Sequence, residues 1–581
     1  MTYDLVLRGG TIVDGTGRER FAGDVAIRGG RVVEIGKVQG RGARELDVSG
    51  LIVAPGVVDL HAHYDAQLHW DPYCTASGWH GTTTCMISNC GFGFAPVRPG
   101  MAERYMRMME NTEQVSYEAM AISMPWTWET FPEWMDHLRS LPKGVNIAPY
   151  LPMNPLLSYV IGPDEAKTRP ATAAERAEMR RIMHEAMDAG AAGFAFSHLG
   201  AVGNSHVDWD QTPMPTDIMA PEEAYNLADV LRERVEGVIQ TLVELPGMSD
   251  PPRWIVEELA RRSGRPVIHN VCVATGVDFE QHRDVLRWLD KVNAEGLNVW
   301  SQGATFRKPL EILPMHYNNW DAIPLLRSLS EAHTREEKLA LVRSPEYRER
   351  FRREYDPQRM WEVSGPLEVY VLTETGGATA YEPFLDKPLG EIAEALGKGI
   401  ADLFLDLLDE SNMDVMLMSL VAGSPNPKAT AEILRHPRVL PGLSDGGAHS
   451  KHGNGGFWST EMIMTLARDT QEVSLEELHA ALSARTAEAA GLKNRGTIAV
   501  GNHADIMVYD LDRLACDPPI RYQQLHDLPG GDWRKVKRAV GIRYTLVNGE
   551  ITFVDGECTG ATPGMLVSDA HRPAKAMEAA E

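Results

Sequence analysis

The sequence predicts an α/β fold, a (β/α)8 TIM-like barrel with a small β-sandwich domain built from both chain ends. Two observations support this prediction. Short strands rich in β-branched residues occur at both ends of the chain, and eight buried strands alternate with helical stretches between them. That alternation is typical of a parallel sheet covered by helices. One long stretch fits neither pattern and is expected to be an insertion.

The two chain ends are expected to form one β-domain from residues 1–55 and 490–565. Near the N-terminus, β-branched residues alternate with polar ones between glycines, and residues 496–551 repeat this style. A small antiparallel sheet fits both segments. Two stretches far apart in sequence are therefore predicted to lie together.

The barrel is expected to occupy residues 56–489. Capping boxes predict helix starts at Thr172 with Glu175 and at Ser474 with Glu477, and Gly190 predicts where the first of these helices ends. Residues 305–427 are too long for a single connection, so we expect an insertion over the active-site face. The eight candidate strands lie at 51–59, 81–90, 145–151, 191–197, 237–244, 266–271, 297–302 and 439–445.

Composition restricts the class of protein. The chain has 581 residues, 43% of them hydrophobic, and a formal net charge of −24. Such a charge repels phosphate backbones and anionic lipid, so we expect no nucleic-acid and no membrane partner. Six cysteines are too few for a disulfide framework and suit a reducing compartment, which predicts a cytoplasmic enzyme.

Two histidines follow the first barrel strand, and a cysteine ends the second. His61 and His63 are separated by one residue, which in an extended strand puts both imidazoles on one face. At the carboxyl end of a barrel strand the pair can bind one divalent ion, although two polar residues at a loop entrance are the alternative. Cys90 ends strand two in a glycine-rich turn, where a thiolate could reach the same ion. Cys85 has the opposite parity and is expected to be a buried packing residue.

Strand eight ends at Asp445, a carboxylate between glycine-rich segments. Asp445 can bind metal and accept a proton from water. Metal coordination lowers the pKa of water from near 16 to roughly 7, so a carboxylate is a sufficient base at neutral pH. A turn cap is the alternative role for such an aspartate.

These motifs resemble the amidohydrolase superfamily, and more narrowly its N-acyl-D-amino-acid deacylase (D-aminoacylase) branch. The resemblance extends from about residue 3 to 560 and rests on segments 56–63, 88–91, 442–449 and 501–506. It implies that His61, His63 and Asp445 are metal ligands and that Asp445 is also the catalytic base. Cys90 would take the bridging place that a carboxylated lysine fills in other members. The fourth candidate strand contains no lysine, which supports Cys90.

The same branch usually supplies metal-binding histidines from strands five and six. In strand six His269 fits, with a hydrogen-bonded core histidine as the alternative. Strand five has no histidine. Gln240, Leu242 and Glu244 share a face there, and whether Gln240 or Glu244 replaces the missing ligand stays open. We therefore expect one zinc ion, with a second ion weak or absent.

The candidate substrate-binding residues are His198, Gln240, His449 and His452. His449 and His452 follow strand eight, which gives them the better position. His206 and Lys308 are further polar residues near strand ends, where solvated loop residues are more common.

The sequence thus predicts a metal-dependent hydrolase that activates water to cleave an amide bond other than a peptide bond. An N-acyl-D-amino acid or a related small molecule is the expected substrate. Hydrolysis of an ester, a cyclic amide or an activated C–C bond by the same site is one alternative. A barrel that binds a ligand without catalysis is another, supported only by the missing strand-five histidine. A homo-oligomer stays open.

Overall fold

Two sheets of parallel strands form the centre of the protein. The computed structural model describes residues 2–201, 206–245, 248, 250–274, 280–315, 323–332, 334–361 and 364–567. The strand orders are β6-β7-β8 and β17-β13-β12-β11-β10-β9, with every neighbouring pair parallel. The strands are β6 (Val57–Asp59), β7 (Thr82–Ile87), β8 (Asn146–Pro149), β9 (Leu151–Pro152), β10 (Gly193–Ser197), β11 (Val238–Leu242), β12 (Val267–Cys272), β13 (Val299–Gly303) and β17 (Val439–Leu440).

The two parallel sheets adjoin at two places. Only Tyr150 separates β8 from β9 along the chain. Ala62 and Gly446, which follow β6 and β17, form a parallel bridge. Each of the eight strands expected from the sequence overlaps a strand of these sheets, so the α/β prediction is confirmed.

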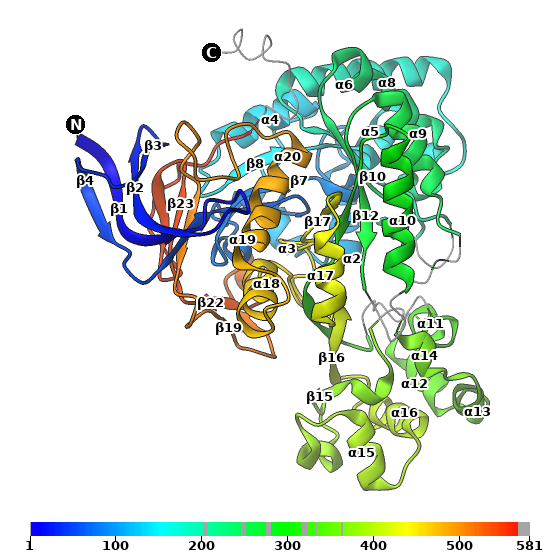
Figure 1. The fold of residues 1–581 in the computed structure, drawn as a ribbon. Helices are drawn as coiled ribbons and strands as arrows, with labels where there is room; N and C mark the ends of the chain where they lie inside the picture. Colours follow the sequence, from blue (N-terminus) through cyan, green and yellow to red (C-terminus); the bar gives the residue numbers. More distant parts are fainter. Residues whose placement is uncertain are drawn as a thin grey trace.

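Helices cover the parallel strands, as the alternating sequence pattern predicts. In Figure 1, α6, α8, α9 and α10 pack beside β10 and β12. Both predicted capping boxes are present, at Thr172 and at Ser474, and Gly190 ends α6 with φ of 106°. The main helices are α2 (Ala102–Glu113), α3 (Tyr117–Ser123), α4 (Phe131–Ser140), α5 (Met153–Val160), α6 (Ala173–Ala189), α8 (Glu222–Arg234), α9 (Arg253–Ser263), α10 (Glu280–Ala294), α17 (Pro427–Arg435), α18 (Trp458–Met462), α19 (Leu475–His479) and α20 (Thr486–Ala490).

The two chain ends share one sheet, with the order β25-β24-β23-β18-β5-β1-β2-β3 and β4 paired to β1. Figure 1 shows these blue and red strands side by side. Within this sheet the two ends are joined by the antiparallel pair β5–β18, in which Pro55 lies opposite Ile506. The strands are β1 (Thr2–Ile12), β2 (Phe21–Arg28), β3 (Arg31–Gly36), β4 (Arg41–Asp47), β5 (Ile52–Pro55), β18 (Ile506–Tyr509), β23 (Ile542–Val547), β24 (Glu550–Val554) and β25 (Glu557–Cys558).

The first predicted barrel strand, 51–59, is divided in the structure. Its first part is β5 of the end sheet and its second part is β6 of a parallel sheet, with Gly56 between them. A Cβ at Gly56 would lie 2.2 Å from the side chain of Thr83, which only glycine avoids. The chain therefore passes from one sheet to the other at the one residue that allows the close approach.

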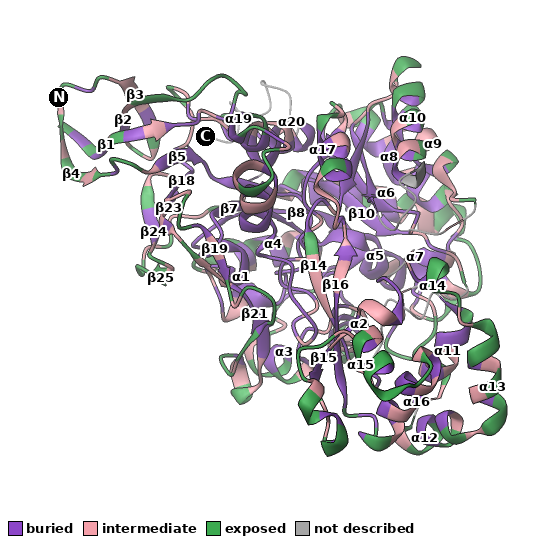
Figure 2. Ribbon diagram, turned by 60° about the horizontal axis from the view of Figure 1, so that its bottom comes forward, coloured by how far each residue is buried: buried purple, intermediate pink, exposed green. Residues whose placement is uncertain are grey.

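Residues 307–423 form a projecting lobe, which lies at the bottom of Figure 1. Its three antiparallel strands have the order β14-β16-β15, and its helices bury an apolar core of their own, visible as buried segments among exposed ones in Figure 2. The elements are β14 (Arg307–Ile312), α11 (Pro324–Glu331), α12 (Arg335–Arg343), α13 (Pro345–Glu354), α14 (Pro357–Met360), β15 (Val371–Glu374), α15 (Leu389–Leu396), α16 (Ile400–Glu410) and β16 (Met416–Gly423). The described elements of this lobe lie within residues 305–427, the stretch for which an insertion stays a prediction.

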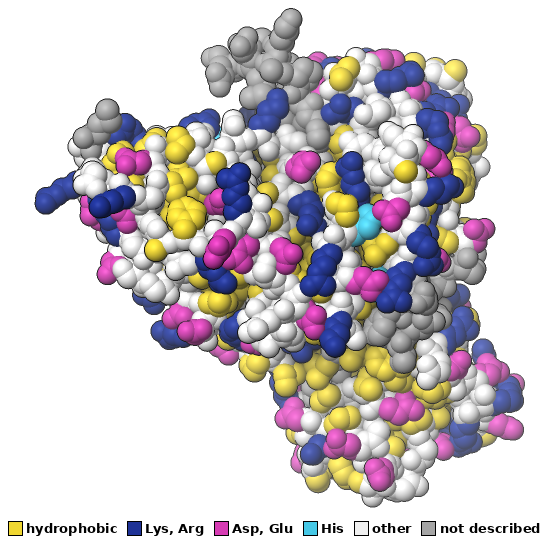
Figure 3. Space-filling model, in the orientation of Figure 1, with side chains coloured by type: hydrophobic (Ala, Val, Ile, Leu, Met, Phe, Trp, Pro, Cys, Tyr) yellow, Lys and Arg dark blue, Asp and Glu magenta, His cyan; other side chains and the backbone are white. Residues whose placement is uncertain are grey.

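The surface mixes both signs of charge. On the face in Figure 3, acidic and basic side chains are interspersed, and hydrophobic side chains gather where the lobe meets the body. Among the described residues, no helix has the length and apolar character needed to cross a membrane.

Candidate active site

A pocket of about 300 Å³ lies at the carboxyl ends of the parallel strands. His61 and His63 reach it after β6, Cys90 after β7 and Asp445 after β17. The lobe supplies part of the wall from β14, including Lys308. Because the carboxyl ends of parallel strands carry the variable loops, catalytic groups of such folds gather at this edge.

Three of the predicted ligands lie together in this pocket. One donor atom from each of His61, His63 and Cys90 lies within 4.8 Å of the other two. The Nε2 atom of His61 is 3.4 Å from the Cys90 Sγ atom and 3.4 Å from Oδ1 of Asp445. Imidazole nitrogen, thiolate and carboxylate oxygen are the ligand types that zinc prefers. The donor atoms of His61, His63 and Cys90 therefore have a spacing that fits one such ion, with Asp445 beside them.

The loops after β6 and β17 are held together by Ser444. Its hydroxyl donates to Asp59 Oδ2 at 2.6 Å and lies 2.8 Å from the carbonyl oxygen of His61. The backbone N–H of His63 donates to the carbonyl of Gly446 at 2.7 Å. These contacts fix the histidine pair relative to the loop that carries Asp445.

Burial controls the charges of the cluster. It raises the pKa of the Cys90 thiol well above its usual range, an effect that Glu113 increases, and lowers the pKa of His61 to about 4. For Asp445, burial alone would raise the pKa. The positive charges of Lys308 and His61 outweigh this effect, so the pKa of Asp445 is lowered; Nζ of Lys308 lies 3.5 Å from Oδ2. Asp445 is thus ionised at neutral pH and able to accept a proton, whereas Cys90 needs a nearby cation to ionise.

His269 lies outside this cluster, in contrast to the expectation that it is a ligand. Its ring contacts Trp288 of α10, its Nδ1 atom is 3.1 Å from the Ser301 hydroxyl, and its Nε2 atom is 3.2 Å from Glu244. The preceding residue, Ile268, packs with residues from other parallel strands, including Met86. Alternation along β12 therefore turns His269 toward the helices and Asn270 toward the pocket.

The two open candidates of strand five have different neighbours. Glu244 pairs with Arg253 through two contacts of 2.5 Å and with His269, away from the cluster. Gln240 lies beside the cluster, where its Oε1 accepts the backbone N–H of Cys90 at 2.7 Å. Gln240 thus lies on the strand that was expected to supply a ligand, and its side chain supports the turn that presents Cys90.

Sequence reasoning missed Asn270. Its side-chain amide lies 2.6 Å from Nδ1 of His61, on the ring edge opposite the cluster. Its Oδ1 atom is buried and has no hydrogen-bond partner among the described residues. Asn270 therefore contacts Nδ1 of His61, the ring nitrogen that faces away from Cys90.

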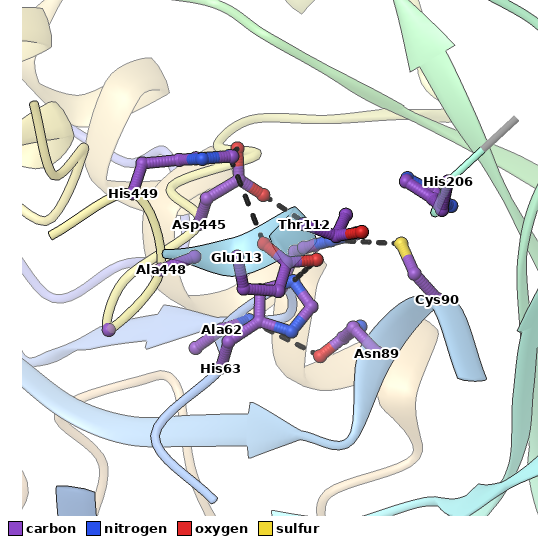
Figure 4. A network of polar contacts seen from close by, with 12 residues as sticks. Ala62, His63, Asn89, Cys90, Thr112, Glu113, His206, Asp445, Ala448 and His449 are labelled. Carbon is purple, nitrogen blue, oxygen red and sulfur yellow. Dashed lines mark hydrogen bonds and ion pairs between the residues drawn. The ribbon is translucent and has the colours of Figure 1, made fainter. Parts of the chain in front are cut away.

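Glu113, the last residue of α2, was also missed. Its side chain is only 5% exposed and lies in the pocket between His63 and His449 (Figure 4). The distances are 3.8 Å from Oε1 to His63 Nε2 and 3.9 Å from Oε2 to His449 Nε2. Burial, with a contribution from Asp445, raises the pKa of Glu113 to about 8. No periodic pattern in the sequence points to this helix end.

Comparison with known proteins places this site in a family. The family model described as the amidohydrolase family matches residues 44–211 and 406–553, more than half of the chain. The chain belongs to the amidohydrolase family. It is an enzyme that hydrolyses carbon–nitrogen bonds other than peptide bonds, so the predicted class of reaction is confirmed.

Similar proteins support the D-aminoacylase-like branch of this amidohydrolase family. An uncharacterized protein of Mycobacterium tuberculosis is 26% identical over 96% of the chain and 93% of that protein. The N-acyl-D-aspartate deacylase of Alcaligenes xylosoxydans xylosoxydans is 26% identical over 97% of the chain and 95% of that protein. A solved structure of N-acyl-D-glutamate deacylase from Bordetella bronchiseptica, complexed with zinc and a phosphonate inhibitor, covers 98% of this chain and 100% of its own, with 20% identity and a TM-score of 0.64.

The candidate substrate residues of this amidohydrolase divide into two groups. His449 and His452 line the pocket, as do His206 and Lys308. His198 is not among the lining residues, and its Nδ1 atom contacts the carbonyl of Thr216 at 2.9 Å. The remaining wall is largely apolar and includes Leu199, Leu242, Leu245, Val271, Phe306 and Leu310.

Five described non-glycine residues that line the pocket have left-handed backbone conformations, and three of them carry candidate functional side chains. Cys90 has φ of 56°, Asp445 of 48° and His449 of 50°. Non-glycine residues pay about 1–3 kcal/mol for such conformations and keep them where surrounding contacts hold them in place. Their concentration around the pocket indicates a site held in position by the fold.

Proposed function

We propose that this amidohydrolase is a zinc-dependent deacylase of N-acyl-D-amino acids or closely related amides, on a (β/α)8 barrel to which the chain ends add a small β-sandwich domain. The observation that carries the proposal is the donor cluster of His61, His63 and Cys90 beside Asp445 in an enclosed pocket. The deacylase relative named above, with which nearly the whole chain aligns, supports this substrate class.

His61, His63, Cys90 and Asp445 would hold one ion. When bound there, zinc supplies Lewis-acid chemistry, which makes water more acidic and polarises a carbonyl oxygen. The absence of His269 from the cluster supports a single ion, because neither strand five nor strand six then presents a histidine to a second one. We therefore propose one tightly held zinc ion.

Asn270 would orient His61 for this role. A histidine that binds metal through Nε2 must carry its proton on Nδ1, and that N–H usually donates to an oxygen. A half-turn of the Asn270 amide places its unpartnered Oδ1 on His61 Nδ1. Asn270 Oδ1 then accepts a hydrogen bond from the Nδ1–H group of His61, which leaves the Nε2 lone pair facing Cys90.

Asp445 would act as the base. Its carboxylate is ionised because Lys308 and the histidines lower its pKa, so it can accept a proton from the attacking water. The same carboxyl then donates the proton to the leaving amine. The strained backbone at Asp445 holds the carboxylate beside His61 during both transfers.

The pocket wall favours substrates with an apolar acyl group. Leu199, Leu242 and Phe306 offer hydrophobic contact, and Lys308 is the cation positioned to meet a substrate carboxylate. Binding of His449 or His452 to the amide would complete the recognition, since both line the same pocket.

The test is hydrolysis of a panel of N-acyl-D- and N-acyl-L-amino acids, an ester and a cyclic amide, before and after chelation. We expect turnover of a D-substrate, loss of at least about 100-fold on chelation and recovery with one equivalent of zinc. Equal turnover by the metal-free protein would contradict the metal-dependent mechanism. Turnover of the ester or cyclic amide alone would replace the substrate class and leave the site unchanged.

A further inference from the structure

Glu113 is a buried carboxyl group to which no described residue donates a hydrogen bond and with which no described Lys or Arg forms an ion pair. Its side chain is 5% exposed. The imidazole nitrogens of His63 and His449 lie within 4.0 Å of it, beyond hydrogen-bond distance. Burying an ionised carboxylate without donors or a cation is unfavourable by several kcal/mol. Glu113 is therefore either protonated, as its raised pKa indicates for the metal-free protein, or paired with a cation that binds in the pocket.

The position of Glu113 is fixed by the strand-eight loop. The backbone N–H of His449 donates to the carbonyl of Glu113 at 2.6 Å, and the Ser450 hydroxyl donates to the carbonyl of Gln114 at 2.5 Å. The end of α2 is thus attached to the segment that follows Asp445. Because both contacts are made by the backbone of α2, they hold the helix end while leaving the Glu113 side chain directed into the pocket.

The spacing between Glu113 and His63 suits two ligands of one ion. Their Oε1 and Nε2 atoms are 3.8 Å apart, too far for a hydrogen bond. Ligand atoms at about 2.0–2.3 Å from a tetrahedral zinc ion lie roughly 3.3–3.8 Å from one another. The distances of 3.4 Å from His61 Nε2 to Cys90 Sγ and to Asp445 Oδ1 belong to the same range. In Figure 4, the Glu113 carboxylate lies beside the His63 ring.

We propose that Glu113 is a further ligand of the ion held by His61 and His63, supplied by helix α2 and not by a barrel strand. This assignment rests on the proposed metal-dependent function and extends its ligand set. It explains why a carboxylate is buried beside a candidate ligand without any other partner. It also makes the ion a connection between α2 and the loops after β6 and β17.

The experiment compares E113Q with the wild-type enzyme and with E110Q. Glu110 lies one turn earlier on the same helix, pairs with Arg107 at 2.9 Å and has a side chain 39% exposed, so E110Q is a matched control. Zinc affinity would be measured by competition with a chromophoric chelator, zinc per chain by elemental analysis, and ligand geometry from the absorption spectrum of the cobalt(II) form. We expect E113Q to bind zinc at least about 10-fold more weakly and to change the cobalt spectrum, with E110Q equal to wild type.

Thermal unfolding separates ligation from a structural role. Metal-free E113Q is expected to melt no lower than metal-free wild type, because glutamine keeps the size of a side chain that is largely uncharged without a cation. Zinc is expected to raise the melting temperature of E113Q less than that of wild type. If E113Q is recovered unfolded, E113D takes its place, and its shorter carboxylate is expected to weaken zinc binding as well.

Equal zinc affinity and equal cobalt spectra in wild type and E113Q would overturn the assignment, even if turnover fell. Wild type that binds no divalent ion would overturn the assignment together with the proposed function. Wild type that binds zinc, with affinity lost in E113Q, but hydrolyses no amide would overturn the function alone.

Discussion

Two buried polar groups in the parallel sheets differ in whether their partners are complete. We call His61, His63, Cys90 and Asp445 the open cluster, and His269, Glu244, Arg253 and Ser301 the closed network. In the closed network the charges are paired, because Glu244 meets Arg253 twice at 2.5 Å. His269 lies 3.1 Å from the Ser301 hydroxyl, and its Nε2 atom lies 3.2 Å from Glu244 without a hydrogen bond to a described residue. In the open cluster, donor atoms face one another across a pocket. Both contain buried histidine, so residue type does not distinguish a ligand from a structural histidine. The groups that surround each histidine make this distinction.

Replacing the base should have the largest effect on the open cluster. We expect D445N to lower kcat by about 10²–10⁴-fold, because an amide cannot accept the proton from water. The matched control is D532N. Asp532 also pairs with a lysine, Lys451, and its side chain has a similar exposure of 22% against 18% for Asp445. Steady-state kinetics on an N-acyl amino acid would check this, and equal kcat for D445N and wild type would remove Asp445 from the mechanism.

Removing the group behind His61 should have an intermediate effect. In N270A the His61 ring loses its contact at Nδ1, so its orientation and tautomer are no longer fixed. We expect about a 10–100-fold loss of zinc affinity. N298A, on the segment just before β13, serves as control because Asn298 contacts Trp300 and Arg438 instead. Chelator competition measures the difference, and unchanged affinity in N270A would show that His61 needs no such support.

Substitution in the closed network should have the smallest effect on turnover. We expect H269Q to retain its zinc and to keep kcat within about 3-fold, while the free energy of unfolding falls by about 1–3 kcal/mol through the lost buried contacts. H63Q, a substitution of the same kind in the open cluster, should lose the ion. Elemental analysis and denaturant unfolding of both variants test the contrast. Loss of zinc from H269Q would place His269 back among the ligands.

Much of the architecture could be predicted from the sequence because the strands are long apolar runs between helices with clear caps. His61, His63, Cys90 and Asp445 each follow such a strand, so the fold brings them to one edge. The face of a strand was harder to predict. Val267–Cys272 is buried on both sides and reads as a continuous run, so the sequence does not tell whether His269 or Asn270 points inward.

Glu113 could not be found in this way. It lies at the end of a helix in a connection, and its place in the pocket depends on a backbone contact with His449, far along the chain. The division of the first strand at Gly56 was missed because both halves are apolar and extended. Contacts between segments distant in sequence decide both features, and local patterns carry no information about them.

The pairing of Pro55 with Ile506 links the beginning of synthesis to its end. When the ribosome has released β5, the strand that covers its edge has not yet been made, and the exposed edge must wait for almost the whole chain. Gly56 alone separates β5 from β6, and β5 pairs with β1 on its other edge, so the strand that leads to His61 is supported on both sides of β5 only after β18 is made. A chain truncated before residue 506 would therefore keep the histidine pair but lose one of the two strands that flank β5.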